Sequence, residues 1–186
     1  MKSNNSIRRH CQGGQSLLEF VFVGIPLMFI IISIFEISRG MWMYQTLAYA
    51  AKTGVRYAIV HGQNCGTTCG VNFGPATTAT TVLGVIRKAG VGLPINNSAC
   101  PASITASSIS TTCVTFTAGG SATTCDLWSA TCGTGVPTGT LQTGTPVRID
   151  IGTPFKSAVS MFWPGSKGQV WTTVNMYATS TDTVKF

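Results

Sequence analysis

An uncharged apolar run near the N-terminus constrains the fold most. Phe20 to Phe35 contains sixteen residues without a charge. A bilayer core about 30 Å thick needs about 20 mostly apolar residues in a helix. The 21 residues from Leu17 to Ile37 reach that length, but they include two carboxylates, Glu19 and Glu36. The run therefore predicts one membrane-spanning helix with a carboxylate near each end.

Basic residues around this run predict its orientation. Lys2, Arg8 and Arg9 precede it, whereas only Arg39 closely follows it. Cytoplasmic flanks carry the excess of Lys and Arg, so we expect the N-terminus in the cytoplasm and the C-terminal part outside. The net charge is +7, but the remaining basic residues are scattered. Because a nucleic-acid surface gathers basic residues on one face, nucleic acid is not an expected partner.

Two other interpretations of the apolar run remain open. A cleaved secretory signal would need a small-residue site, and Ala48-Tyr49-Ala50 offers one. That site lies well beyond the run, with Glu36 and Arg39 in between. A buried core helix is the second alternative, but a run of this length is long for one.

A glycine and a glutamate precede the run with a fixed spacing. Gly14 is followed by four residues and then Glu19. A carboxylate close to lipid is costly, so Glu19 is a candidate functional residue. Cleavage after Gly14 would create a positive partner, the α-amino group of Gln15, for Glu19 of a neighbouring copy. Alternatively, Glu19 lies near the cytoplasmic edge and simply reaches water.

This arrangement resembles the leader of type IV pilin-like precursors, which a prepilin peptidase cuts after the glycine. Glu19-Phe20 is similar to the Glu-aromatic pair of the Flp pilins of tight-adherence systems. Gly13 offers a competing site one residue earlier. Cleavage there would put Glu19 at the sixth position of the mature chain, so cleavage after Gly14 is favoured.

The next stretch resembles the TadE-like proteins. Their signature is an apolar helix, then E-x-x-R, an aromatic-Q-x-L segment and A-A-x-x-G-x-R-Y-A. The matching residues here are Glu36, Arg39, Tyr44, Gln45, Arg56 and Tyr57. The resemblance implies a non-enzymatic minor pseudopilin that takes part in assembly of a tight-adherence (Flp, type IV-like) pilus.

The resemblance also implies partners and a location. The partners are a prepilin peptidase, other pilin and pseudopilin subunits, inner-membrane pilus assembly proteins and the lipid bilayer. The location is the bacterial inner membrane, in a single pass, with the C-terminal domain in the periplasm. Incorporation into a cell-surface pilus is left open.

Helical character continues beyond the span to about His61. One face carries small and apolar residues at spacings of three and four: Met43, Leu47, Ala50, Gly54 and Ala58. The small residues Ala50, Gly54 and Ala58 permit close helix approach. Two interpretations are open: the face packs laterally in an assembly, or it docks on the chain's own sheet.

Residues 63–186 form a second zone rich in Thr, Ser and Gly. We expect a short amphipathic helix within Thr77–Ala89, with Val82, Val85, Ile86 and Ala89 on one side. Alternating and β-branched patterns predict strands at Cys113–Thr117, Val147–Ile151 and Gln169–Ala178. The fold class is therefore α+β, with a long helix and an antiparallel β-rich domain. The expected organisation is a cleaved leader (1–14), a transmembrane and assembly helix (15–62) and an outer domain (63–186).

Seven cysteines indicate disulfides. Cys11 lies in the leader, and the other six lie in the outer zone: Cys65, Cys69, Cys100, Cys113, Cys125 and Cys132. Six cysteines allow 15 pairings, and the sequence does not choose among them. A zinc site built on Cys65 and Cys69 is the alternative, but an oxidising compartment favours disulfides. No metal and no cofactor is expected.

Acid–base groups are scarce. The mature chain would contain one histidine, His61, and the outer zone contains only three acids: Asp126, Asp150 and Asp182. General acid–base and nucleophilic catalysis both need such groups in mutual reach, so we do not expect an enzyme. The alternative to a pseudopilin is a permanently anchored ectodomain that binds a receptor or a glycan. Cleavage of the leader discriminates the two.

Overall fold

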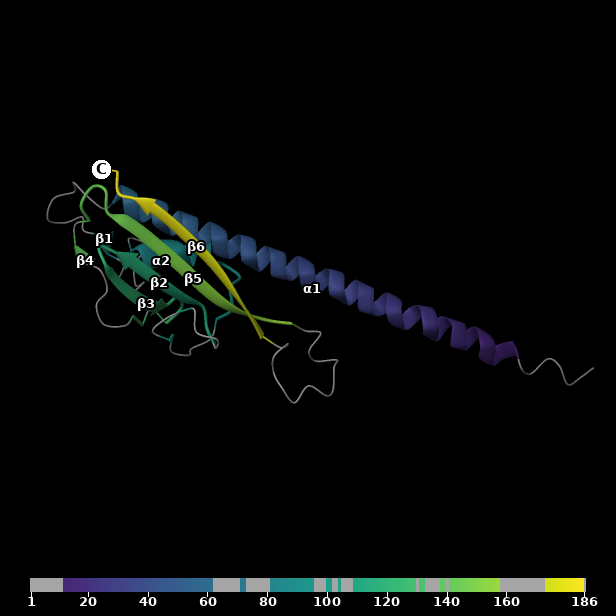
Figure 1. Cartoon of the computed structure of the whole chain (residues 1–186). Helices are drawn as coiled ribbons and strands as arrows, with labels where there is room; N and C mark the ends of the chain where they lie inside the picture. Colours follow the sequence, from purple (N-terminus) through teal and green to yellow (C-terminus); the bar gives the residue numbers. More distant parts are fainter. Residues whose placement is uncertain are drawn as a thin grey trace, which may run out of the picture. The chain divides into compact units, whose positions relative to one another are not determined.

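The computed structural model of the chain describes residues 12–61, 71–72, 81–95, 100–101, 104, 109–129, 131–132, 138–139, 141–157 and 173–185. The elements are α1 (Gln12–Val60), β1 (Val71–Asn72), α2 (Val82–Ala89), β2 (Cys113–Ala118), β3 (Ser121–Asp126), β4 (Thr138–Gly139), β5 (Pro146–Lys156) and β6 (Thr173–Thr183) (Figure 1). The chain divides into two compact units, and the division falls inside α1, between Arg39 and Gly40.

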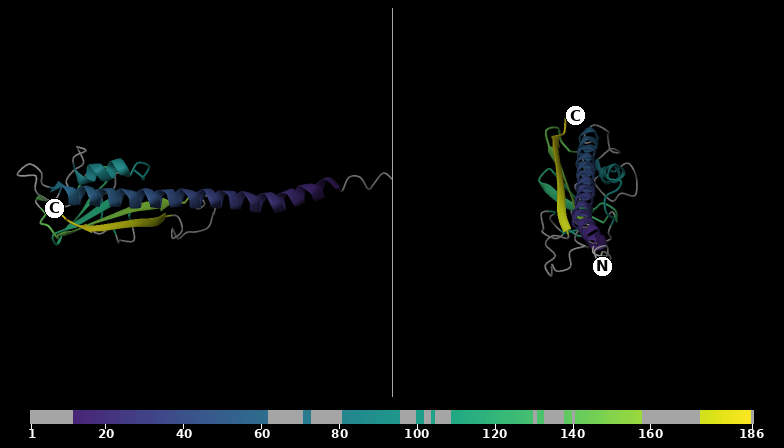
Figure 2. Two further views of the ribbon diagram at one scale, coloured as in Figure 1. Left: turned by 90° about the horizontal axis from the view of Figure 1, so that it is seen from above. Right: turned by 90° about the vertical axis from the view of Figure 1, so that its right-hand side faces the viewer.

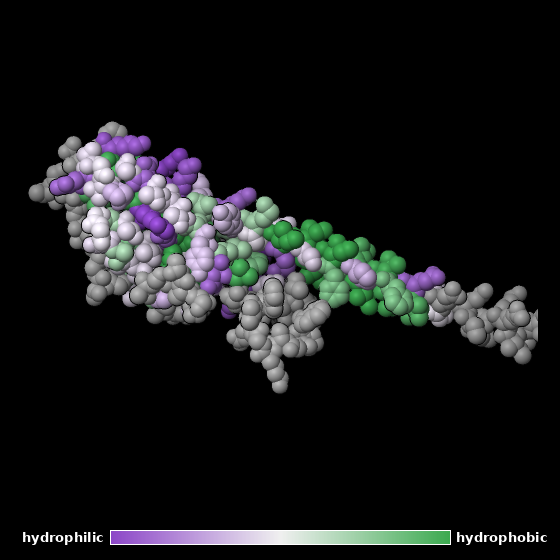
Figure 3. Space-filling view, in the orientation of Figure 1, coloured by the Kyte–Doolittle hydropathy of each residue, from purple (hydrophilic) through white to green (hydrophobic). Residues whose placement is uncertain are grey.

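The first unit contributes the apolar part of α1. Most of its large hydrophobic side chains from Leu17 to Ile37 are exposed, and they form the hydrophobic surface seen in Figure 3. The most apolar 18-residue window has a mean hydropathy of 2.6, and none of it is buried. The hydroxyls of Ser33 and Ser38 donate to the carbonyls of Phe29 and Ile34, at 2.8 Å each. These hydroxyls are thus satisfied within the helix itself. By its length and composition, this part of α1 is able to cross a membrane.

The second unit contains an antiparallel sheet with strand order β3-β2-β5-β6. The β2–β3 hairpin turns at Gly119 and Gly120, whose φ angles of 58° and 84° suit glycine. The short strands β1 and β4 pair separately. A long apolar helix and an antiparallel sheet confirm the predicted α+β class.

The core of this unit lies between the sheet and two helices. Figure 2 shows α2 and β6 on opposite sides of the part of α1 that belongs to the second unit. The inner face of the sheet contributes Val114, Phe116, Ile149 and Ile151, all fully buried. Leu47 from α1 and Ile86 from α2 are fully buried in the same cluster. The compact unit therefore begins within α1, at Gly40, because the helix beyond that point shares its core with the sheet.

The predicted elements are found where the structure describes them. The predicted strands correspond to β2, β5 and β6, and β5 and β6 pair along eleven residues. Helix α2 begins at Val82 because the Thr81 side chain caps it, accepting from the amide of Gly84 at 3.1 Å. Residues 77–80 lie outside the described part of the chain. Leu83 is fully buried, whereas Val85 and Ala89 are half-buried, so the apolar face is rotated from the predicted one.

Asp150 lies on the outer face of β5 with Arg148, but neighbouring side chains cover it. Arg148 is exposed, but Asp150 is only 9% exposed. Asp150 is on a central strand, in register with Thr115 on β2 and Thr179 on β6. Its carboxylate accepts from Thr179 Oγ1 at 2.6 Å and from Arg148 Nε at 2.8 and 2.9 Å. Neighbouring threonines and one arginine therefore cover and satisfy this charge.

Two disulfides join four of the six outer cysteines. Cys100 bonds Cys113, thirteen residues away, and Cys125 bonds Cys132, seven residues away. Cys113 and Cys125 lie on the neighbouring strands β2 and β3, so both bonds fix loops to the same hairpin. Cys65 and Cys69 lie outside the described residues.

Peptide mapping of the non-reduced chain should recover Cys100–Cys113 and Cys125–Cys132 as separate linked pairs. Replacing both Cys100 and Cys113 by alanine should lower the free energy of unfolding by about 3 kcal/mol, because the bond closes a loop in the unfolded chain. Urea denaturation followed by circular dichroism measures this change. A linkage between Cys113 and Cys132 would contradict the assignment.

Candidate functional site

The N-terminal residues of α1 form the first part of the site. Gly14 is helical and exposed, and a Cβ built on it would have no atom within 4 Å. Gln15 is also helical. Glu19 follows in the same helix and is exposed. The backbone at Gly14 and the carboxylate of Glu19 are thus both open to a partner molecule.

Glu36 and Arg39 form an ion pair at the other end of the apolar helix. The distance from Glu36 Oε1 to Arg39 Nη1 is 3.9 Å, across three residues of α1. The Glu36 side chain is 15% exposed and that of Arg39 is 52% exposed. Among the described residues, Glu36 Oε2 has no hydrogen-bond partner. Such a long and partly exposed ion pair contributes only a few tenths of a kcal/mol to the stability of the helix.

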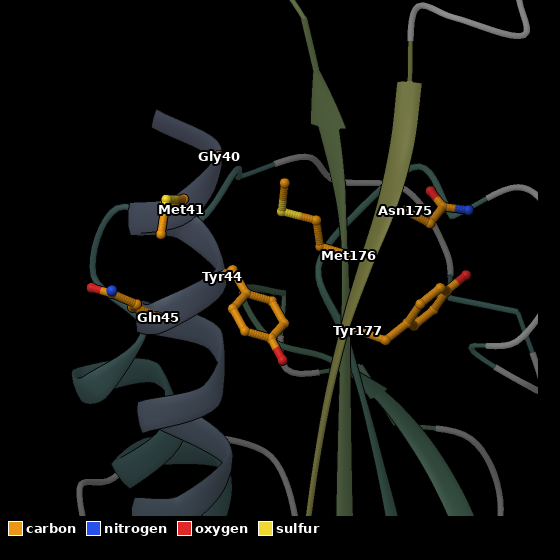
Figure 4. Close-up of a pocket in the computed structure, with 7 residues that line it drawn as sticks. All are labelled: Gly40, Met41, Tyr44, Gln45, Asn175, Met176 and Tyr177. Carbon is orange, nitrogen blue, oxygen red and sulfur yellow. The ribbon is translucent and has the colours of Figure 1, made fainter. Parts of the chain in front are cut away.

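Tyr44 and Gln45 line an open groove in the second unit. Its other lining residues are Gly40, Met41, Asn175, Met176 and Tyr177 (Figure 4). The groove has a volume of about 600 Å³ and contains no charged side chain in its lining. One wall comes from α1 and the other from β6, the edge strand of the sheet. A groove of this composition suits an apolar or amphipathic partner rather than a charged one.

Arg56 and Tyr57 lie near the end of α1. Arg56 is exposed, and Tyr57 is half-buried. The Tyr57 ring stacks on His61 with 4.0 Å between the ring centroids. His61 Nδ1 lies 2.9 Å from the Tyr57 carbonyl oxygen, and its backbone amide donates to the same carbonyl at 3.2 Å. His61 therefore closes the helix end, a structural role for the one histidine of the predicted mature chain.

The small-residue face of α1 docks on the chain's own core. Ala50 and Ala58 have no exposed surface. A Cβ on Gly54 would lie 2.5 Å from Ile86 Cγ1 and 3.2 Å from Ile149 Cδ1. Of the two interpretations of this face, the structure shows the docking one. Ala50, Gly54 and Ala58 therefore pack inside the chain's own second unit, and the assembly role expected for them stays a prediction.

The carboxylates of the outer zone have structural partners. Asp126 is 2% exposed, and its Oδ1 accepts from the amides of Trp128 and Ser129 at 2.7 Å each. Its Oδ2 accepts from Thr111 Oγ1 at 3.0 Å. Asp182 accepts from the Thr183 amide at 2.8 Å. Among the described residues, no group of three histidine, cysteine or acidic side chains could hold a metal ion.

The model of the TadE-like protein family matches residues 14–56. This segment is similar to the TadE-like proteins. The match confirms the resemblance drawn from the signature, and it begins at Gly14 and ends at Arg56. Neither the curated proteins nor the solved structures gave a match.

The TadE-like segment spans both units, since the division between them falls after Arg39. Its first part contains the exposed apolar helix with Glu19. Its second part contains the groove residues Tyr44 and Gln45 and the buried small face. Sequence reasoning missed the β6 half of the groove. Met176 and Tyr177 are distant in sequence and lie in an ordinary strand pattern, so no local signal indicated that they meet α1.

Two glycines of the TadE-like segment should respond oppositely to alanine. Gly54→Ala should lower the free energy of unfolding by about 1–2 kcal/mol, because the new methyl group overlaps the buried Ile86 and the overlap exceeds the gain in helix propensity. Gly40→Ala is the matched control. A Cβ there would meet Met176 Cε at an ordinary 3.5 Å, so stability should hold or rise by up to about 1 kcal/mol.

Thermal and urea unfolding of both variants in detergent measures the contrast. Equal stabilities for the two variants would contradict the close packing at Gly54.

Proposed function

We propose that this chain is a non-enzymatic minor pseudopilin that takes part in assembly of a tight-adherence pilus. One observation carries the proposal: the TadE-like match begins at Gly14 and takes in the whole exposed apolar helix. An apolar helix with this much exposed surface needs lipid or other helices around it. Pilus assembly at a membrane supplies both.

The proposed maturation step is cleavage by a prepilin peptidase between Gly14 and Gln15. The peptide bond lies in an exposed part of α1, clear of neighbouring side chains at Gly14. Cleavage gives Gln15 a positive α-amino group four residues before Glu19. In an assembly of parallel helices, Glu19 of one subunit pairs with that amine on the next. The pairing compensates a carboxylate that is otherwise costly near lipid, and it fixes the stagger of neighbouring helices.

Burial of the small-residue face limits which residues of α1 can contact a neighbouring subunit. Ala50 and Ala58 are occupied by the chain's own core. Contacts between subunits therefore come from the exposed apolar side chains between Leu17 and Ile37. We place the second unit in the periplasm, where its two disulfides would form and persist. The basic residues before the span support this orientation.

The first test is the intact mass and N-terminal residue of the chain from cells with and without the prepilin peptidase. A start at Gln15 that disappears without the peptidase is the expected result. A Met1 start in both strains would contradict processing and favour the anchored binding module. A start near Ala51 would indicate an ordinary signal peptide and would contradict the membrane-spanning helix.

The second test removes the charge of Glu19. Glu19→Gln should leave cleavage after Gly14 intact but reduce recovery of the chain with pilus subunits by about tenfold, because a charge-assisted hydrogen bond contributes about 1.5–3 kcal/mol. Quantitative immunoblotting of sheared and membrane fractions measures the recovery. Lys52→Gln is the matched control, since it removes an exposed charge from the second unit. Unchanged recovery of the Glu19 variant would refute the pairing.

A further inference from the structure

The two edges of the four-stranded sheet differ in how they are covered. At the β3 edge, Cys125 forms a bridge with Cys132, and the amide of Asp126 donates to the carbonyl of Thr131 at 2.9 Å. At the other edge, none of the described strands pairs with the outer side of β6. Within the described residues, no main-chain group of β6 bonds another main-chain group outside its ladder with β5. The β6 edge is therefore open.

Two prolines of β5 show which groups of β6 point to this open edge. Pro146 is in register with Thr183, and Pro154 is in register with Asn175. Proline has no N–H, so neither pair can exchange the two bonds of a hydrogen-bonded antiparallel pair. Because the two kinds of pair alternate along a ladder, every second residue of β6 turns its N–H and C=O groups away from β5. Asn175 and Tyr177 are two of these residues.

Strand β6 lacks the features that keep an open edge from pairing. Its eleven residues, Thr173–Thr183, contain no proline, lysine or arginine, and its ladder with β5 runs without a bulge. Sheets commonly block an open edge with such features, because unpaired N–H and C=O groups attract another strand. The one charge of β6, Asp182, lies at the end away from the groove and accepts from the Thr183 amide at 2.8 Å. The rest of this edge is suited to receive a strand.

The groove between α1 and β6 lies beside the open edge. Figure 4 shows the Met176 side chain and the Tyr44 ring turned toward the space between α1 and β6, with Tyr177 on the other side of the strand. A strand added to β6 would continue the sheet and turn every second side chain toward α1. The groove, with a volume of about 600 Å³, is large enough to receive one of these side chains. Gln45 and Asn175 in its lining supply amide groups that can bond the polar groups of a peptide.

We propose that the β6 edge and the groove form a strand-addition site for an extended, uncharged segment of another polypeptide. The segment inserts one large apolar side chain between α1 and β6. Main-chain hydrogen bonds to β6 supply the affinity, and the groove selects the side chain. The groove lining contains no charged group, which favours an uncharged segment.

A second copy of this chain is a poorer occupant, because each copy carries eight Lys/Arg and only three Asp from Gly40 to Phe186. Every residue that carries the proposal belongs to the second unit. The site therefore depends neither on cleavage of the leader nor on a membrane span.

Binding of a short peptide to the full chain in detergent tests the site. The probe is the fluorescently labelled peptide KTVTFTVTE, which has no net side-chain charge and places valines and one phenylalanine on one face. Fluorescence polarisation measures its dissociation constant. Two N-methylated forms of the probe, each methylated on alternate residues, lack the N–H donors of one strand edge only. The form methylated on the edge that faces β6 should bind at least about tenfold more weakly, and the other form should bind as the parent does.

Tyr44→Ala tests the groove. The variant removes a ring from the groove wall and should weaken binding of the parent peptide by about tenfold. Tyr49→Ala is the matched control, because Tyr49 is a tyrosine of the same helix outside the groove lining. Tyr49 is 63% exposed and Tyr44 is 55% exposed, so neither variant should disturb the core.

The expected result is that one methylated form binds and the other does not, and that only the Tyr44 variant loses affinity. Binding of both methylated forms, or of neither, would overturn strand addition. Equal affinities of the Tyr44 and Tyr49 variants would overturn the groove as the side-chain site. Absence of binding of the parent peptide at about 1 mM would overturn the whole site. A dimer of the chain that the peptide dissociates would make a second copy the occupant and overturn the assignment to another polypeptide.

Discussion

The contact of Gly54 with Ile86 and Ile149 is the constraint on which the second unit depends. Because Gly54 has no side chain, α1 approaches both α2 and the sheet closely enough for one core to form among them. Ala50 and Ala58 extend the same close approach along the helix. The small-residue pattern, which in a membrane would bring two helices together, here brings one helix onto its own domain.

One continuous helix thus serves two surroundings. Between Leu17 and Ile37 its apolar side chains are exposed, whereas beyond Gly40 its apolar face is buried under the sheet and α2. The change occurs over three residues. Next to that point the exposed groups include the charged Arg39 and the amphipathic rings of Trp42 and Tyr44. A gradual change of polarity along the chain is what a boundary between lipid and water requires.

Much of the fold followed from local patterns. The alternating pattern predicted β5, because that pattern depends only on neighbouring residues. Alternation places Asp150 on the outer face of β5, but it does not reveal that Thr115 and Thr179 are its neighbours on the adjoining strands. Disulfide pairing depends on which strands become neighbours, so the cysteine count left it open.

The candidate site was likewise predictable from the sequence only in part. The signature around Tyr44 and Gln45 was visible in the sequence, and the family match covers both positions. The β6 wall of their groove was not visible in the sequence, because Met176 reaches α1 only after β6 has joined the sheet. The same limit applied to the small face of α1. Its spacing was evident, but whether it meets a neighbour or its own sheet depends on contacts far along the chain.

The packing at Gly54 has a consequence for how the chain reaches its fold. Ile149 follows Gly54 by 95 residues, so the ribosome makes the helix long before the strand that covers it. Contacts of such high sequence separation form slowly, because the loop between them must close first. During this delay the apolar face of α1 is uncovered and prone to aggregate. Lipid next to the helix, or a helper protein in the same compartment, would protect the nascent domain until β5 and β6 arrive.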